Sequence, residues 1–96
     1  SDRDRAAQIR FALEKYAAEN NAEPLDWTDD NSWKYRIAYN SNTKMLEAYS
    51  CIFYKHDTVY FDSAKTAKNA IEAVGEEDVL WLHRDYQPYL NAFKMD

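Results

Sequence analysis

The chain of 96 residues contains a single glycine, Gly75, and a single cysteine, Cys51. One glycine excludes the Gly-rich loops that cradle phosphate groups in nucleotide-binding proteins. One cysteine excludes an internal disulfide, so nothing in the chain requires an oxidising compartment. We therefore expect a cytoplasmic protein.

Long apolar runs are also missing. No stretch approaches the roughly twenty residues that a helix needs to cross a bilayer, and the first ten residues, SDRDRAAQIR, lack the apolar core of a secretion signal. We expect no membrane insertion. Because the chain begins with Ser1, we expect either a domain cut from a longer polypeptide or a protein that has lost its initiator methionine.

Basic residues are too few to balance the acidic ones. The chain has 12 Lys and Arg against 17 Asp and Glu, a formal net charge of −5. This charge opposes approach to nucleic acid or to an anionic lipid surface, so we expect neither as the main partner. Hydrophobic residues make up 46% of the chain, enough for one core in a single domain spanning 1–96.

Recognised catalytic and metal-binding motifs are absent from the sequence. Cys51, His56 and His83 fall on different predicted elements, without the spacing of a zinc site. The aspartates of residues 26–30 lack the glycine and the distal glutamate of a calcium-binding loop, and no serine or cysteine lies in a nucleophile elbow. We therefore predict no enzyme, no metal and no cofactor.

Helical periodicity marks the first part of the chain. Apolar residues recur on one face between residues 4 and 20, which predicts an amphipathic helix within 1–22. Phe11 falls beside this stripe, and we interpret it as part of a wide buried face. An acidic connector follows over 23–32.

Alternation of bulky and smaller residues predicts a strand from residue 33 to residue 39, with Lys34 and Arg36 on the face opposite the core aromatics. A turn rich in asparagine and threonine then predicts a hairpin. The next segment, 45–55, carries apolar groups on both faces, which predicts a central strand. With a short third strand, we expect a three-stranded antiparallel meander over 33–61.

Capping residues define the helices that follow. Ser63 is a good N-cap and the glycine a natural helix end, which predicts a helix over 63–75. Three carboxylates suit the start of a second helix over 76–87. Pro88 then interrupts this helix and leaves 88–96 as a tail. The predicted fold is α+β: an N-terminal helix, the meander, and two C-terminal helices packed on the sheet.

Two segments, WKYRIAYNSNTKMLEAYS and TVYFDSAKTAKNAIEAVGEEDVL, resemble a small domain that is common in uncharacterised phage and prophage proteins of Gram-positive bacteria. The resemblance covers roughly residues 27–86 and departs from the usual pattern at 81–86, where such proteins have a Lys-Lys-Tyr-like ending. It implies a phage or prophage lineage and, with it, a location in the host cell. The matching residues are Tyr60-Phe61, Ser63, Ala70-Ile71-Glu72 and Gly75-Glu76.

Aromatic and acidic residues point to a protein partner. Eight tyrosines and three tryptophans exceed what one small core buries comfortably, and exposed Tyr and Trp concentrate binding energy at interfaces. The two acidic clusters, 23–30 and 76–78, offer carboxylates to a basic groove on another protein. Trp27 and Trp81 have the alternative role of closing the ends of the core. The predicted partner-binding residues are Trp27, Trp81, Tyr86, Tyr89, Asp29, Asp30, Glu76, Glu77 and Asp78.

We therefore expect a non-enzymatic protein-interaction module of phage or prophage origin. The first alternative is a phage inhibitor of host defence, of the anti-CRISPR or anti-restriction type, whose acidic surface occupies a nucleic-acid channel. The second is a DNA-associated accessory domain of a phage replication or regulatory protein, with a contact face of Lys34, Arg36, Lys65 and Lys68. A homodimer through strand addition at a sheet edge also stays open.

Overall fold

The computed structural model describes residues 1–22, 24–29, 33–51 and 58–94. It confirms the α+β class, with an N-terminal helix, a three-stranded antiparallel sheet and helices after it. The elements in chain order are α1 (Asp2–Asn20), β1 (Lys34–Asn40), β2 (Met45–Cys51), β3 (Tyr60–Phe61), α2 (Ala64–Val74), α3 (Glu76–Leu80), η1 (Trp81–Tyr86) and α4 (Gln87–Lys94).

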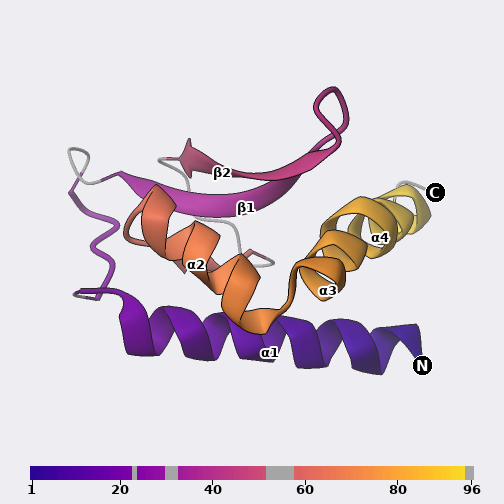
Figure 1. Ribbon diagram of the computed structural model, residues 1–96, viewed down its shortest axis with the longest axis horizontal. Helices are drawn as coiled ribbons and strands as arrows, with labels where there is room; N and C mark the ends of the chain where they lie inside the picture. Colours follow the sequence, from indigo (N-terminus) through magenta and orange to yellow (C-terminus); the bar gives the residue numbers. More distant parts are fainter. Residues whose placement is uncertain (23, 30–32, 52–57, 95–96) are drawn as a thin grey trace.

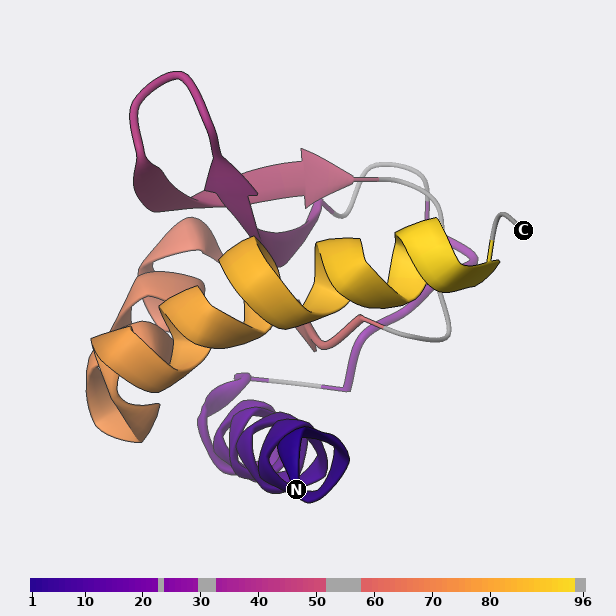
Figure 2. The same ribbon diagram turned by 90° about the vertical axis from the view of Figure 1, so that its right-hand side faces the viewer.

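The elements form three layers. Strands β1 and β2 lie on one side, α1 lies on the opposite side, and α2 with the C-terminal helices fills the space between them (Figures 1 and 2). One core joins the three layers, because α1, the sheet and the middle helices each contribute buried apolar side chains. These side chains are Ala6, Ile9, Leu13, Ala17, Ile37, Phe61, Ala67, Ala70, Ile71, Val79 and Leu82.

The central strand of the sheet is β1, with β2 on one side and β3 on the other. The predicted meander order, with the strand from residue 45 in the centre, is therefore wrong. Strand β1 is the one that is covered on both faces, because Ile37 is buried in the core and Lys34 is buried on the opposite face. The apolar residues on both faces of β2 had predicted a strand covered on both sides, but Met45 is exposed. Residues 52–55 of the predicted strand lie outside the described residues.

Helix α1 buries a narrow stripe. Ile9, Leu13 and Ala17 face the core, whereas Phe11 is 68% exposed. The predicted wide buried face is thus wrong, because α1 is the outermost layer and contacts the rest of the protein along one side only (Figure 2). None of the described helices combines the length and the apolar character needed to cross a membrane.

The C-terminal helix does not end before Pro88. Segments α3, η1 and α4 follow one another from residue 76 to residue 94, so the predicted tail is helical as far as it is described. A proline inside an α-helix removes one hydrogen bond and clashes with the carbonyl four residues earlier. Here η1 is a π-helical turn, in which the Gln87 N–H donates to the Leu82 carbonyl five residues back. This wider turn changes the hydrogen-bond register just ahead of Pro88 and lets the helix continue.

Candidate protein-binding groove

A groove of about 430 Å³ lies between the first turn of α1 and the C-terminal helices. Three of the four aromatic residues predicted for a partner surface line it. Charged side chains from the start of α1 and from η1 complete its walls. The lining consists of Asp2, Arg3, Trp81, Asp85, Tyr86 and Tyr89.

The aromatic wall of the groove depends on the π-helical turn. The rings of Trp81 and Tyr86 stack with centroids 5.2 Å apart and an interplanar angle of 27°. In an α-helix, residues three or four apart share a face, whereas the hydrogen bonds of a π-helix join residues five apart and its wider turn brings such residues closer to one face. The turn therefore brings Trp81 and Tyr86 together, and the exposed ring of Tyr89 extends the wall along α4. A helical period of 3.6 in the sequence does not reveal this stack.

Arg5 crosses from α1 to the C-terminal helices beside the groove. Its guanidinium lies 4.0 Å from the centroid of the Trp81 ring, and its Nη2 donates to Asp78 Oδ1 at 3.1 Å. The Arg5 and Asp78 side chains are 45% and 50% exposed. Exposed contacts of these two kinds contribute on the order of 0.5–1 kcal/mol each. Helical periodicity in the sequence could not identify this cross-link.

A second hollow, of about 290 Å³, lies between α1 and the end of α2, and Arg5 is among the residues that line it. Asp78 lines this hollow, while Trp81 lines the aromatic groove. Arg5 thus contacts one residue from the lining of each space. The second hollow is lined by Arg5, Gln8, Ile9, Ala12, Val74 and Asp78.

The carboxylate of Asp85 has a fixed partner. Arg84 donates to it from Nε at 3.0 Å and from Nη2 at 2.9 Å. These hydrogen bonds lower the pKa of Asp85 and raise the pKa of Arg84. Asp85 therefore stays ionised at neutral pH, and the groove keeps a carboxylate in its wall.

The predicted acidic residues separate in space. Among the three carboxylates of the second cluster, Asp78 pairs with Arg5. Glu76 and Glu77 are exposed in the first turn of α3, where carboxylates stabilise a helix N-terminus. Asp29 lies in the connector, and its backbone carbonyl accepts a hydrogen bond from Lys34 Nζ at 3.1 Å. Asp30 lies outside the described residues.

Trp27 belongs to the outer face of the sheet and not to the groove. Its ring packs edge-to-face on Tyr60, with centroids 4.6 Å apart, and the Lys34 ammonium lies 5.1 Å from its centroid. Trp27 is partly buried, and Tyr60 beneath it is buried. This places Trp27 on the face of the sheet away from the core, so the geometry does not support its alternative role of closing the core.

The four cations predicted for a nucleic-acid face do not share a face. Lys34 is only 2% exposed, because the connector over residues 24–29 folds back across it. Arg36 is partly buried, with its guanidinium 5.7 Å from the Tyr49 ring centroid. Lys65 and Lys68 are exposed on α2, on the core side of the sheet. The expectation that Lys34 contacts nucleic acid is therefore wrong.

A polar network occupies the outer face of the β1–β2 hairpin. The Glu47 carboxylate accepts hydrogen bonds from Asn40 Nδ2 at 3.0 Å and from the Tyr49 hydroxyl at 2.8 Å, and Thr43 donates to it at 3.3 Å. The bonds from Asn40 and Tyr49 lower the pKa of Glu47. Because the polar groups of this network satisfy one another, the hairpin offers a partner fewer open contacts than the groove does.

The groove is thus the place where the exposed ring of Tyr89, the partly buried rings of Trp81 and Tyr86, a guanidinium and carboxylates converge. The side chains that form it come from both ends of the described chain, namely α1 and the helices after residue 76. Its function has to be argued from this geometry, because no known protein family, no curated protein and no solved structure matches the chain.

Proposed function

We propose that the protein is a non-enzymatic interaction module of phage or prophage origin, and that its aromatic groove binds a basic segment of a partner protein. One observation carries the proposal. The Trp81 ring, at the edge of an open groove, already holds a guanidinium at 4.0 Å, with the Asp78 carboxylate beside it. The phage lineage rests on the sequence resemblance.

The aromatic side chains of the groove suit it to binding. Trp, Tyr and Arg are the residue types that most often dominate the free energy of protein association. The stack of Trp81 on Tyr86 already restricts both rings. These two side chains therefore lose less conformational entropy when a partner binds. Tyr89 is 64% exposed. A partner would therefore remove much of its apolar surface from water on binding. A volume of about 430 Å³ lies within the range of sites that take a small ligand or a few side chains.

Charge favours a basic partner. An arginine from a partner would meet the same aromatic face and the same carboxylate that hold Arg5, since guanidinium groups bind both. The net charge of −5 attracts such a segment before contact. Because the contacts of Arg5 are half exposed, its displacement costs little.

The inhibitor of host defence is a special case of this proposal, in which the basic segment lines the nucleic-acid channel of a nuclease. The same groove and the same negative charge would serve it. A DNA-associated role has weaker support, because Lys34 is buried and the remaining predicted cations lie on different faces.

Titration of the ¹⁵N-labelled protein with three short peptides, matched in length and rich in arginine, lysine or glutamate, tests the proposal by NMR. We expect the arginine peptide to shift the Trp81 indole signal and the backbone amide signals of residues 85–87 and 89, with a weaker response to lysine and none to glutamate. The Tyr89→Ala variant should bind the arginine peptide about 5–30-fold more weakly, the loss expected for an interface aromatic that contributes 1–2 kcal/mol.

The matched control is Phe11→Ala, which removes an equally exposed ring from the outer side of α1. This variant should bind the peptide as the wild type does. Shifts that lie outside the groove, or equal losses in both variants, would contradict the proposal.

A further inference from the structure

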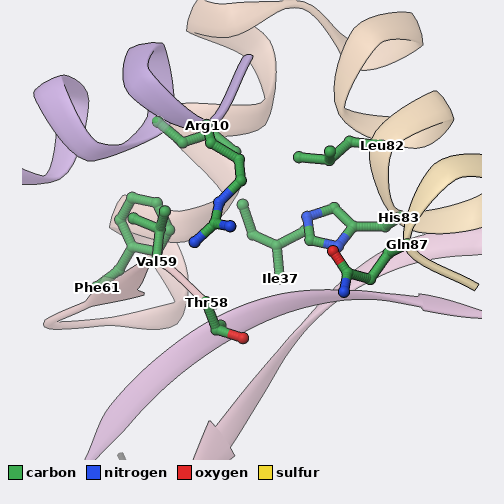
Figure 3. Close-up of a pocket in the computed structure, with 9 residues that line it drawn as sticks. Arg10, Ile37, Thr58, Val59, Phe61, Leu82, His83 and Gln87 are labelled. Carbon is green, nitrogen blue, oxygen red and sulfur yellow. The ribbon is translucent and has the colours of Figure 1, made fainter. Parts of the chain in front are cut away.

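A different face of the C-terminal helices borders a small cavity of about 20 Å³. Figure 3 shows side chains from three parts of the chain gathered around it, with Arg10 entering from α1 and His83 and Gln87 from η1 and α4. Apolar side chains form most of the remaining wall. The lining consists of Arg10, Leu13, Ile37, Thr58, Val59, Phe61, Leu82, His83 and Gln87.

One polar atom in this wall lacks a hydrogen-bond partner among the residues that the structure describes. His83 Nε2 is buried and makes no hydrogen bond with any described residue. A buried polar atom without a partner costs about 1–3 kcal/mol, and the large majority of such atoms in folded proteins bond to protein or to an ordered water. The imidazole of His83 therefore needs a partner that the neighbouring side chains do not supply.

The size and polarity of the cavity suit one water molecule. A cavity must offer roughly 10–15 Å³ to hold a water, and the water needs two to four polar partners. The cavity of His83 exceeds this volume and has further polar groups in its wall, namely Arg10, Thr58 and Gln87. Organic ligands occupy sites of about 300 Å³ or more, so a cavity of this size takes nothing of that kind.

We infer that this cavity binds a single internal water, which hydrogen-bonds to His83 Nε2 and to at least one polar group among Arg10, Thr58 and Gln87. Water both donates and accepts, so it satisfies Nε2 whichever ring nitrogen carries the proton. Through Arg10 the water would join the π-helical turn to α1, and through Thr58 it would join that turn to the segment that leads into β3. It is thus a structural ligand that holds His83 in place between these elements.

Burial gives His83 the charge state that this site requires. Desolvation, followed by the positive charges of Arg36 on β1 and Arg10 on α1, lowers the pKa of His83 to about 4. The imidazole is therefore neutral at pH 7 and keeps one nitrogen as an acceptor.

Water–protein NOE and ROE spectra of the isotope-labelled protein at pH 7 test the inference. We expect a long-lived water signal at the His83 ring proton Hε1 and at the Ile37 methyl groups, because a trapped water stays longer than the tumbling time of the protein. Absence of a water signal at the His83 ring would overturn the inference, and this readout requires no variant.

Two variants locate the water. His83→Phe retains an aromatic ring but has no ring nitrogen, so the water signal at Ile37 should disappear. Phe11→Ala leaves the cavity untouched and should retain the signal. A folded His83→Phe variant that keeps the Ile37 signal would show that His83 does not bind the water. A crystal structure with Nε2 bonded to a protein atom would also overturn the inference.

Discussion

Lys34 illustrates what sequence patterns miss at the scale of one residue. Alternation along β1 correctly placed it on the face opposite Ile37, but it could not show that the connector turns back over that face. The ammonium is tolerated there because it donates to the Asp29 carbonyl and lies near the Trp27 ring. A strand pattern reports which way a side chain points and says nothing of what covers it.

His83 should make stability depend on pH. Its folded-state pKa of about 4 lies below the ordinary value of 6.5. As the pH falls from 7 toward 5, the unfolded chain takes up the proton first, so the free energy of unfolding decreases. Full protonation of the unfolded state alone would cost on the order of 3 kcal/mol, and part of this loss should already appear at pH 5.

Urea denaturation of wild type and His83→Leu at pH 7, 6 and 5 checks this dependence. The difference in unfolding free energy between the two proteins isolates His83 from the carboxylates, which titrate mostly below this range. We expect the wild type to lose stability relative to the variant as the pH falls. Parallel pH profiles for the two proteins would contradict the assigned pKa.

At the scale of elements, the two ends of α2 were predicted correctly from residues close together in the sequence. Ser63 caps α2 by accepting a hydrogen bond from the Thr66 N–H at 3.0 Å, and Gly75 follows the last residue of this helix with a φ of 121°. Both were predicted, because a cap depends on residues within one turn.

Gly75→Ala should lower the free energy of unfolding by about 1–3 kcal/mol, because a residue with a Cβ is strained at this positive φ. The new methyl group would find ordinary space, 3.7 Å from Asp78 Oδ2, so backbone strain is the cause. Glu72→Ala, on the exposed face of α2, should change stability by less than about 0.5 kcal/mol. Urea denaturation compares the two variants, and equal stabilities would argue against strain at Gly75.

Strand order and the continuation through Pro88 could not be derived from local signals. Strand β3 pairs with β1 through Tyr35 and Phe61, which are far apart in sequence, and an apolar pattern does not specify which strand is the neighbour. Pro88 ordinarily ends a helix, and only the preceding π-helical turn removes that conflict. For the same reason, sequence patterns identified Trp81, Tyr86 and Tyr89 as candidates for a binding surface. They predicted neither the groove that these residues line nor the contacts of Arg5 with Trp81 and Asp78.

At the scale of the whole molecule, α1 is held by one narrow contact face. Leu13→Ala removes a side chain that is 2% exposed and should lower the free energy of unfolding by about 2–5 kcal/mol. Phe11→Ala, two residues away on the solvent side, should lower it by less than about 0.5 kcal/mol. Thermal and urea denaturation measure both variants, and a large loss for Phe11→Ala would show that its ring is covered in solution.

The π-helical turn makes the groove depend on the number of residues and not only on their identity. Trp81 and Tyr86 stack because the chain between them fills one wide turn. Each residue of an α-helix turns the chain by about 100°, so loss of one residue from this turn would rotate all of α4 relative to α3. Tyr89 would leave the groove while its own sequence neighbourhood stayed the same. In this helix, deletion of a single residue would change which side chains line the groove, even if every remaining residue stayed the same.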